Sequence, residues 1–172
     1  MFQDEARFGC RQDPRRAWAP PGVRPLVPTE IVREYGYAYA AVSPHDGVLD
    51  SLVLPDVNAE RMSLFLAEVA RRPRDEFIFM VLDGAGWHTA HALSVPERRR
   101  LYPLPARSPE LNPVEHVWDE WREKWLCNRF FDCQEAVDAQ VTRGLAALER
   151  NPKRVASLAG CAWIATIPLT GP

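Results

Sequence analysis

Three acidic side chains stand where a carboxylate is costly unless it has a task. Asp4 lies within an apolar opening run, Asp83 directly follows a continuous apolar run, and Glu115 begins an amphipathic stretch. A charge beside an apolar surface costs free energy unless it is paired or binds a cation. Three converging carboxylates would bind hard divalent cations through oxygen, as Mg²⁺ prefers. The pattern therefore indicates a candidate carboxylate metal site.

Each of these acids also has an ordinary structural explanation. Asp4 fits a solvated acid near a chain end, and Asp83 with the glycine after it fits a turn. Glu115 stands three residues after Asn112, with a proline at the first helical position, which is the spacing of a capping box. On spacing alone the capping explanation is the stronger one for Glu115, and residue chemistry leaves both explanations open.

Asp4 is expected to lie within a strand, because the residues around it alternate in polarity. The two faces of that strand are expected to be Phe2, Asp4, Ala6 and Phe8 on one side and Gln3, Glu5 and Arg7 on the other.

The other two acids are expected at the ends of a strand and a helix. Residues 77–82 are apolar without alternation, which predicts a central strand buried on both faces. Asp83 then lies at the carboxyl end of this strand, where open α/β sheets place their sites. A helix over residues 113–126 would carry Glu115 in its first turn.

The remaining pattern predicts an antiparallel hairpin, with strands over 35–43 and 48–54 joined by a Pro-His-Asp-Gly turn. Asn58 is expected to cap a helix over residues 59–71. The other expected elements are a loop or short hairpin around Trp18 over 11–30, a loop and short helix over 88–99, a short strand over 100–105, and a helix over 134–150. This order predicts an α/β fold, a mixed sheet flanked by helices.

The bulk properties fit one soluble domain without membrane spans. The 172 residues are 47% hydrophobic and 26% charged, and no apolar run approaches the ~18 residues that a bilayer span requires. The four cysteines have neither C-x-x-C nor zinc-finger spacing, so we expect reduced thiols in a cytoplasmic protein. The net charge of −2 neither predicts nor excludes a DNA partner, since basic residues can gather on one face.

Three local motifs resemble the signatures of insertion-sequence transposases of the IS630 group. That group belongs with the Tc1/mariner transposases to one DDE superfamily. The motifs are FQDEARFG at residues 2–9, VLDGAGWH at 81–88, and LPARSPELNPVEHVW at 104–118. They occur in the family's order, and the 32 positions between Asp83 and Glu115 are close to its usual gap. The Ser-Pro-Glu-Leu-Asn-Pro-x-Glu string is the most specific of these signals.

The resemblance implies an RNase H-like fold, with Asp4, Asp83 and Glu115 as the catalytic and metal-binding triad. Glu115, and not Glu110, matches the family's catalytic position, and it can cap its helix as well as bind metal. The implied cofactor is Mg²⁺ or Mn²⁺, two ions per site, and the implied reaction is DNA strand cleavage and strand transfer. The implied partners are transposon ends, target DNA and a second copy of the chain, in a bacterial cytoplasm with nucleoid association on DNA.

The resemblance also suggests candidate DNA contacts. His88, in the loop after Asp83, is as readily a plain loop histidine as a residue that contacts phosphate or positions substrate. Candidates for contacts to the phosphate backbone are Arg7, Arg11, Arg15, Arg16 and Arg107, each of which has ordinary solvated surface as its alternative.

The expected domain organisation is a single catalytic domain over residues 1–172, with a helical extension from about residue 130. The family usually carries helix-turn-helix domains before this domain, and Met1 stands three residues before Asp4, so we expect that region to be absent. Three explanations fit this expected absence: the chain is a fragment, a second reading frame normally joined by frameshift, or the product of a decayed element. The alternative functions are a catalytically silent remnant that binds partner subunits, and a cellular RNase H-like nuclease, against which the third motif argues.

Overall fold

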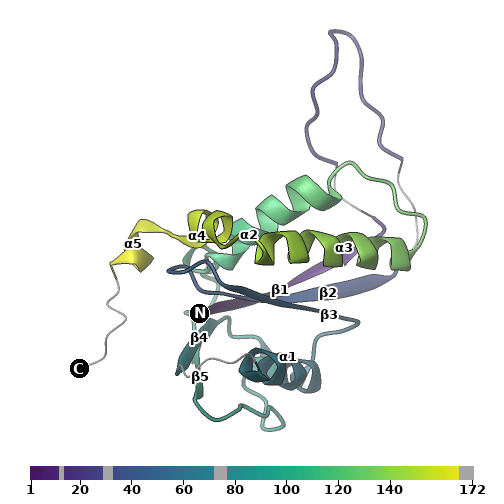
Figure 1. Ribbon diagram of the computed structural model, residues 1–172. Helices are drawn as coiled ribbons and strands as arrows, with labels where there is room; N and C mark the ends of the chain where they lie inside the picture. Colours follow the sequence, from purple (N-terminus) through teal and green to yellow (C-terminus); the bar gives the residue numbers. More distant parts are fainter. Residues whose placement is uncertain (12–13, 29–32, 72–76, 167–172) are drawn as a thin grey trace.

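In the computed structural model, which describes residues 1–11, 14–28, 33–71 and 77–166, a mixed sheet lies between two layers of helices (Figure 1). The sheet has five strands in the order β3-β2-β1-β4-β5. Strands β1, β2 and β3 pair antiparallel, whereas β4 is parallel to both β1 and β5. The strands are β1 (Phe2–Gly9), β2 (Tyr35–Val42), β3 (Leu49–Leu54), β4 (Ile78–Leu82) and β5 (Arg99–Pro103). The fold class expected from the sequence is thereby confirmed.

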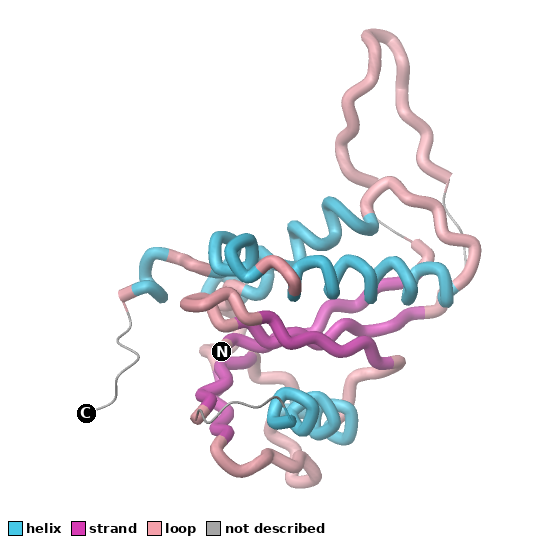
Figure 2. Tube along the Cα trace, in the orientation of Figure 1, coloured by secondary structure: helices cyan, strands magenta, loops and turns pink. Residues whose placement is uncertain are grey.

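The helices divide between the two faces of the sheet. Helices α2, α3 and α4 lie over one face of β1–β3, and α1 lies on the opposite side (Figures 1 and 2). They are α1 (Ala59–Arg71), α2 (Val114–Trp121), α3 (Gln134–Glu149), α4 (Pro152–Ala159) and the one-turn α5 (Ala162–Ala165). None of the helices in the described part of the chain is long and apolar enough to cross a membrane.

Strand β1 forms as its alternation predicts, and residues on both of its faces are buried. Ala6 and Phe8 pack in the core beneath α2 and α3. Gln3, on the other face, is also fully buried, and its paired residue Ala41 packs in the core cluster that includes α1. Because β1 is the middle strand between two helical layers, its polar face is enclosed at Gln3, whereas Arg7 further along the same face is exposed.

Strand β4 departs from its expectation in the opposite direction. Ile78, Met80 and Leu82 pack into the α1 cluster, but Phe79 on the other face is 62% exposed. Helices α2 and α3 lie against β1, β2 and β3 and do not extend over β4. The prediction of a strand buried on both faces was therefore wrong.

The hairpin and the first helix begin as the sequence predicts. The amide of Ser43 donates to the carbonyl oxygen of Val48 at 2.8 Å, and Gly47 takes a left-handed φ of 72°. Asn58 caps α1, since its Oδ1 accepts from the amide of Arg61 at 2.9 Å.

A long connection between β1 and β2 projects away from the body of the molecule (Figure 1). Among its described residues, 14–28, the side chains of Trp18 and Leu26 are exposed. The loop expected around Trp18 is confirmed over these residues, and residues 12–13 and 29–32 lie outside the described part.

Candidate active site

Asp4 is held on β1 beneath α2. Its Oδ2 accepts a hydrogen bond from Nε1 of Trp118 at 3.0 Å. Burial, followed by the negative charges of Glu115 and Glu5, raises the pKa of Asp4 to about 7. A carboxyl group in this state ionises at neutral pH only at a cost in free energy.

Asp83 directly follows β4 and is exposed. Its Oδ1 accepts from the amide of Ala85 at 2.9 Å, so the side chain closes the turn that leaves the strand. The same oxygen lies 2.9 Å from Nδ1 of His88. The turn explanation and a functional role therefore coexist at this residue.

Glu115 lies half-buried in the first turn of α2, and its carboxylate makes no hydrogen bond to any described residue. The capping box anticipated with Asn112 does not form. Asn112 instead bridges two motifs: its Oδ1 accepts from the amide of Val114 at 3.2 Å, and its Nδ2 donates to the carbonyl oxygen of Gln3 at 3.1 Å. The carboxylate of Glu115 therefore has no hydrogen-bond partner among the described residues, and it lies near Asn112, which holds the start of α2 against β1.

The three acids meet at one pocket of about 360 Å³, which Asp4, Asp83 and Glu115 all line. Arg107, whose backbone has a left-handed φ of 59°, contributes a cationic side chain to the same wall. Glu110 is exposed in the preceding turn and does not line the pocket.

A second layer of contacts surrounds Asp83. His88 is buried, and its Nε2 lies 3.0 Å from Oε1 of Glu5, while its Nδ1 faces the Oδ1 of Asp83. Glu5 also accepts from Nε1 of Trp87 at 3.3 Å. Burial alone would lower the pKa of His88, but the hydrogen bond and charge of Glu5, together with Asp83, outweigh burial and raise it. The hydrogen-bond partner of Nδ1 is the backbone carbonyl oxygen of Asp83 at 3.1 Å, and only the doubly protonated imidazole donates from both ring nitrogens.

His88 is therefore not a plain loop residue, because it ties the turn after β4 to β1. Glu5, Asn112 and Trp118 are positioning residues that the sequence did not single out for this role. The only signal for Glu5 was its place directly after Asp4, while Asn112 resembled a helix cap and Trp118 a core residue.

The donor set suits a hard divalent cation. All three candidate ligands are carboxylate oxygens, and the raised pKa of Asp4 shows that its charge lacks compensation. As the side chains stand, no three His, Cys, Asp or Glu groups in the described residues are close enough to share one ion. The Asp83 oxygen is engaged by Ala85 and His88, so binding requires its side chain to exchange those contacts.

The arginine candidates divide between two pockets. Arg107 lines the pocket of the three acids, whereas Arg7, Arg11 and Arg15 line a separate one near the end of β1. Arg16 is exposed and lines neither.

Residues 1–138 match the family described as DDE superfamily endonuclease. The chain is also 38% identical over 130 residues to "Uncharacterized protein y4pE/y4sA" of Sinorhizobium fredii (strain NBRC 101917 / NGR234), which covers 75% of this chain and 96% of that protein.

The fold is similar to solved structures of Mos1 transposase. A paired-end complex with the left transposon end matches 92% of this chain at 19% identity and a TM-score of 0.58. A mariner paired-end complex with Mn matches at 20% identity and a TM-score of 0.59, and the isolated catalytic domain at 19% and 0.53. The chain spans 55% of the transposase chain in each paired-end complex and 81% of the catalytic domain. These likenesses establish an RNase H-like fold.

Proposed function

This chain belongs to the DDE superfamily endonucleases, and from that premise we propose that it is the catalytic part of an IS630-group transposase. Its reaction is the cleavage of DNA strands and their joining to target DNA in the movement of an insertion sequence. Its single domain works as a homodimer on transposon ends and target DNA in the cytoplasm.

One observation carries the proposal. Three acids from three motifs, far apart in the sequence, line a single pocket that also presents the cationic Arg107. The half-buried Asp4 and Glu115 repel one another, which makes the site costly unless it holds positive charge.

The residues divide the work at this pocket. Asp4, Asp83 and Glu115 would hold two Mg²⁺ or Mn²⁺ ions, and the Mos1 complex with Mn supports this choice of metal. When bound, such ions polarise the attacking and leaving oxygens of an in-line displacement. Trp118 fixes the orientation of the Asp4 carboxylate through its Nε1 hydrogen bond. The attacking oxygen belongs to water in strand cleavage and to a DNA 3′-hydroxyl in strand joining.

Around this centre, His88 and Glu5 fix the turn that presents Asp83. Arg107 lies where it can bind a phosphate oxygen beside the acids, with the charge-assisted hydrogen bonds that guanidinium groups make to phosphate. Arg7, Arg11, Arg15 and Arg16 are the further proposed contacts to the DNA backbone.

The test compares two glutamates of one motif. Glu115→Gln should abolish nicking of supercoiled plasmid in Mg²⁺ or Mn²⁺, because the amide removes one anionic ligand from the pocket. Glu110→Gln, five residues earlier and outside the pocket, is the matched control and should nick at the wild-type rate.

Equal nicking by both variants would remove Glu115 from the site. Absence of metal-dependent nicking by the wild-type chain itself, alongside retained partner binding, would favour the second candidate, a catalytically silent regulator. The separation of the three carboxylates in the described structure is the observation that speaks for this candidate.

A further inference from the structure

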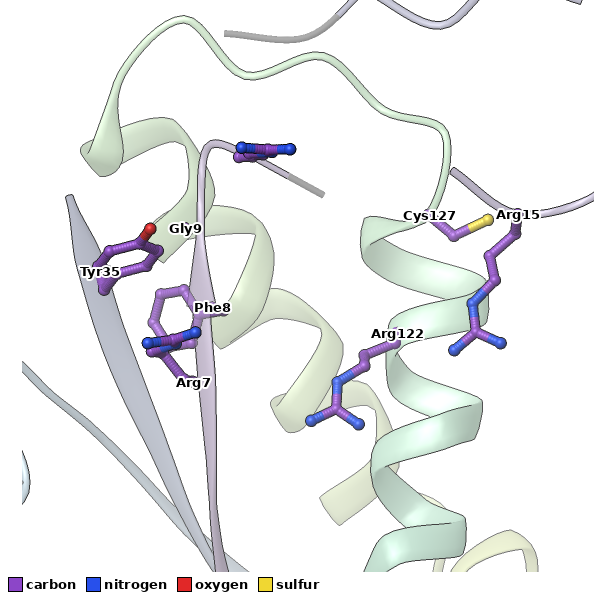
Figure 3. Close-up of a pocket in the computed structure, with 8 residues that line it drawn as sticks. Arg7, Phe8, Gly9, Arg15, Tyr35, Arg122 and Cys127 are labelled. Atoms are coloured by element: carbon purple, nitrogen blue, oxygen red, sulfur yellow. The ribbon is translucent and has the colours of Figure 1, made fainter. Parts of the chain in front are cut away.

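A second pocket, of about 340 Å³, lies at the far end of β1 from the acids (Figure 3). Four of its eight lining residues are arginines, and none is a carboxylate within the described part of the chain. The lining consists of Arg7, Phe8, Gly9, Arg11, Arg15, Tyr35, Arg122 and Cys127. In a chain with 21 basic and 23 acidic residues, this is a pronounced local excess of positive charge.

The arginines come from three different segments. Arg7 lies on β1 with its guanidinium carbon 4.7 Å from the centre of the Tyr35 ring, so stacking holds it flat against the strands. Arg122 extends from the π-helical segment Arg122–Leu126 that continues α2 (Figure 3). Within the described residues, neither Arg7 nor Arg122 forms an ion pair with a carboxylate.

Arg15 is held over the pocket by a clamp from a distant part of the sequence. Its amide donates to Oδ1 of Asn128 at 3.0 Å, and Nδ2 of Asn128 donates to its carbonyl oxygen at 3.2 Å. Asn128 adopts a left-handed φ of 54° to present this side chain. The guanidinium of Arg15 has only a loose ion pair, 3.9 Å from the exposed Asp119.

Gathering like charges around one hollow costs free energy unless an anion enters it. Guanidinium groups match phosphate oxygens in geometry as well as in charge. We propose that this arginine pocket binds backbone phosphates of the DNA strand that enters the site of the three acids. The inference rests on the proposed function, because it takes the DNA of that reaction as the ligand.

The spacing along β1 fits one continuous strand of DNA. The arginine pocket begins three residues along β1 from Asp4, which is roughly 10 Å and equals the axial rise of about three nucleotides. The pocket reaches both faces of the strand, because Phe8 shares the face of Asp4 and Arg7 lies on the other face. Among the described residues, β1 pairs with β4 only between Phe2 and Val81, so β4 does not cover the rest of that edge. The arginine pocket would therefore hold the strand about three nucleotides from the reacting phosphate.

The test measures how salt weakens the binding of a short duplex to the 172-residue chain, in EDTA so that no cleavage occurs. Each lost phosphate contact lowers the slope of log affinity against log salt by about 0.9. When salt rises from about 50 to about 200 mM, the affinity of the double variant Arg7→Gln/Arg122→Gln should therefore fall by a factor about 12-fold smaller than that of wild type. The matched control is Arg143→Gln/Arg150→Gln, which removes one exposed charge of α3 and one at its C-cap, both outside the pocket, and should keep the wild-type slope.

A second variant keeps every arginine and removes only the clamp. Asn128→Gly preserves the left-handed backbone and should lower the slope by about one contact, because Arg15 is released. Unchanged slopes in both this variant and the arginine double variant, with wild-type melting temperatures, would overturn the proposal.

A phosphate arm separates DNA from a small ligand. If millimolar-scale inorganic phosphate stabilises wild type but not the double variant, and DNA slopes are equal, the pocket serves a small phosphate compound and the proposal fails. Plasmid nicking is measured separately. If the salt slopes of the variants change as expected but the wild-type chain never nicks DNA, the arginine pocket still binds DNA phosphates and the proposed function is rejected.

Discussion

Asp4 shows how a single side chain can cost stability for the sake of a site. Its pKa rises from an ordinary 3.8 to about 7, first through burial and then through the neighbouring Glu115 and Glu5. The folded state therefore holds its proton more tightly than the unfolded state does. The contribution of Asp4 to stability is complete below pH 3.8, declines as pH rises toward 7, and remains at its lowest above that.

We expect Asp4→Asn to stabilise the metal-free protein at pH 8 by up to about 4 kcal/mol, the equivalent of the pKa difference. The amide oxygen still accepts from Trp118, and the buried charge is gone. At about pH 3, below both pKa values, the variant and wild type should unfold alike, because Asp4 is then largely protonated in both states. Urea titrations at the two pH values in EDTA give the comparison, and a stability gain that does not depend on pH would contradict the electrostatic explanation.

At the scale of elements, the fold depends on a close approach of two helical segments at Gly144. A methyl group at this position would lie 2.8 Å from Cγ of Trp125 and 3.0 Å from Cδ1 of Trp121. Trp121 is fully buried and packs edge-on against Phe8 of β1, with ring centres 6.1 Å apart. The tryptophan therefore cannot yield without disturbing the sheet that carries Asp4.

Gly144→Ala should lower stability by up to roughly 2 kcal/mol, since overpacking costs about 1–3 kcal/mol and alanine regains only ~1 kcal/mol in a helix interior. Thr142→Ala, two residues earlier on the exposed side of α3, has the helical benefit without the clash and should be neutral or slightly stabilising. Thermal unfolding of both variants measures the difference, and a stabilised Gly144→Ala would show that α3 can move away from the tryptophans.

The same scale shows what the sequence could and could not predict. Periodicity was sufficient to locate the strands, the hairpin and the helix over residues 59–71, because the pattern of polar and apolar residues lies within each segment itself. Burial of Gln3 and exposure of Phe79 depend on which helical layer covers which strand, and a single strand's pattern does not contain that information. The change from α2 to a π-helical segment at Arg122 likewise has no local signal.

At the candidate site, the sequence located the three acids but not what holds them. Their local motifs resembled a family signature, whereas the Trp118 and Asn112 contacts join residues more than a hundred positions apart. The spacing of Asn112 and Glu115 predicted a capping box as one explanation, but the side chain of Asn112 contacts the amide of Val114 and the carbonyl oxygen of Gln3 instead. Such contacts follow from the packing of α2 on β1 and appear only with the fold.

For the whole molecule, the clustered acids link metal binding to folding. A ligand that binds only the folded state stabilises it by mass action. Millimolar-scale Mn²⁺ should therefore raise the melting temperature of wild type, through relief of repulsion at Asp4 and Glu115. Asp83→Ala should abolish most of this shift, whereas Asp56→Ala, on an exposed loop outside the pocket, should retain it. An equal shift in both variants would place the metal elsewhere.

The projecting connection between β1 and β2 is a site where a protease can cut the chain. Arg16 is exposed on it and precedes Ala17, which makes the connection open to trypsin. A cut there separates the peptide that bears Asp4 from the peptide that bears Asp83 and Glu115, yet all eight residues of β1 remain paired with β2. Such a nicked protein should run as two pieces in denaturing gels and as one species in native size-exclusion chromatography, so the domain is divisible at this loop into two complementing fragments.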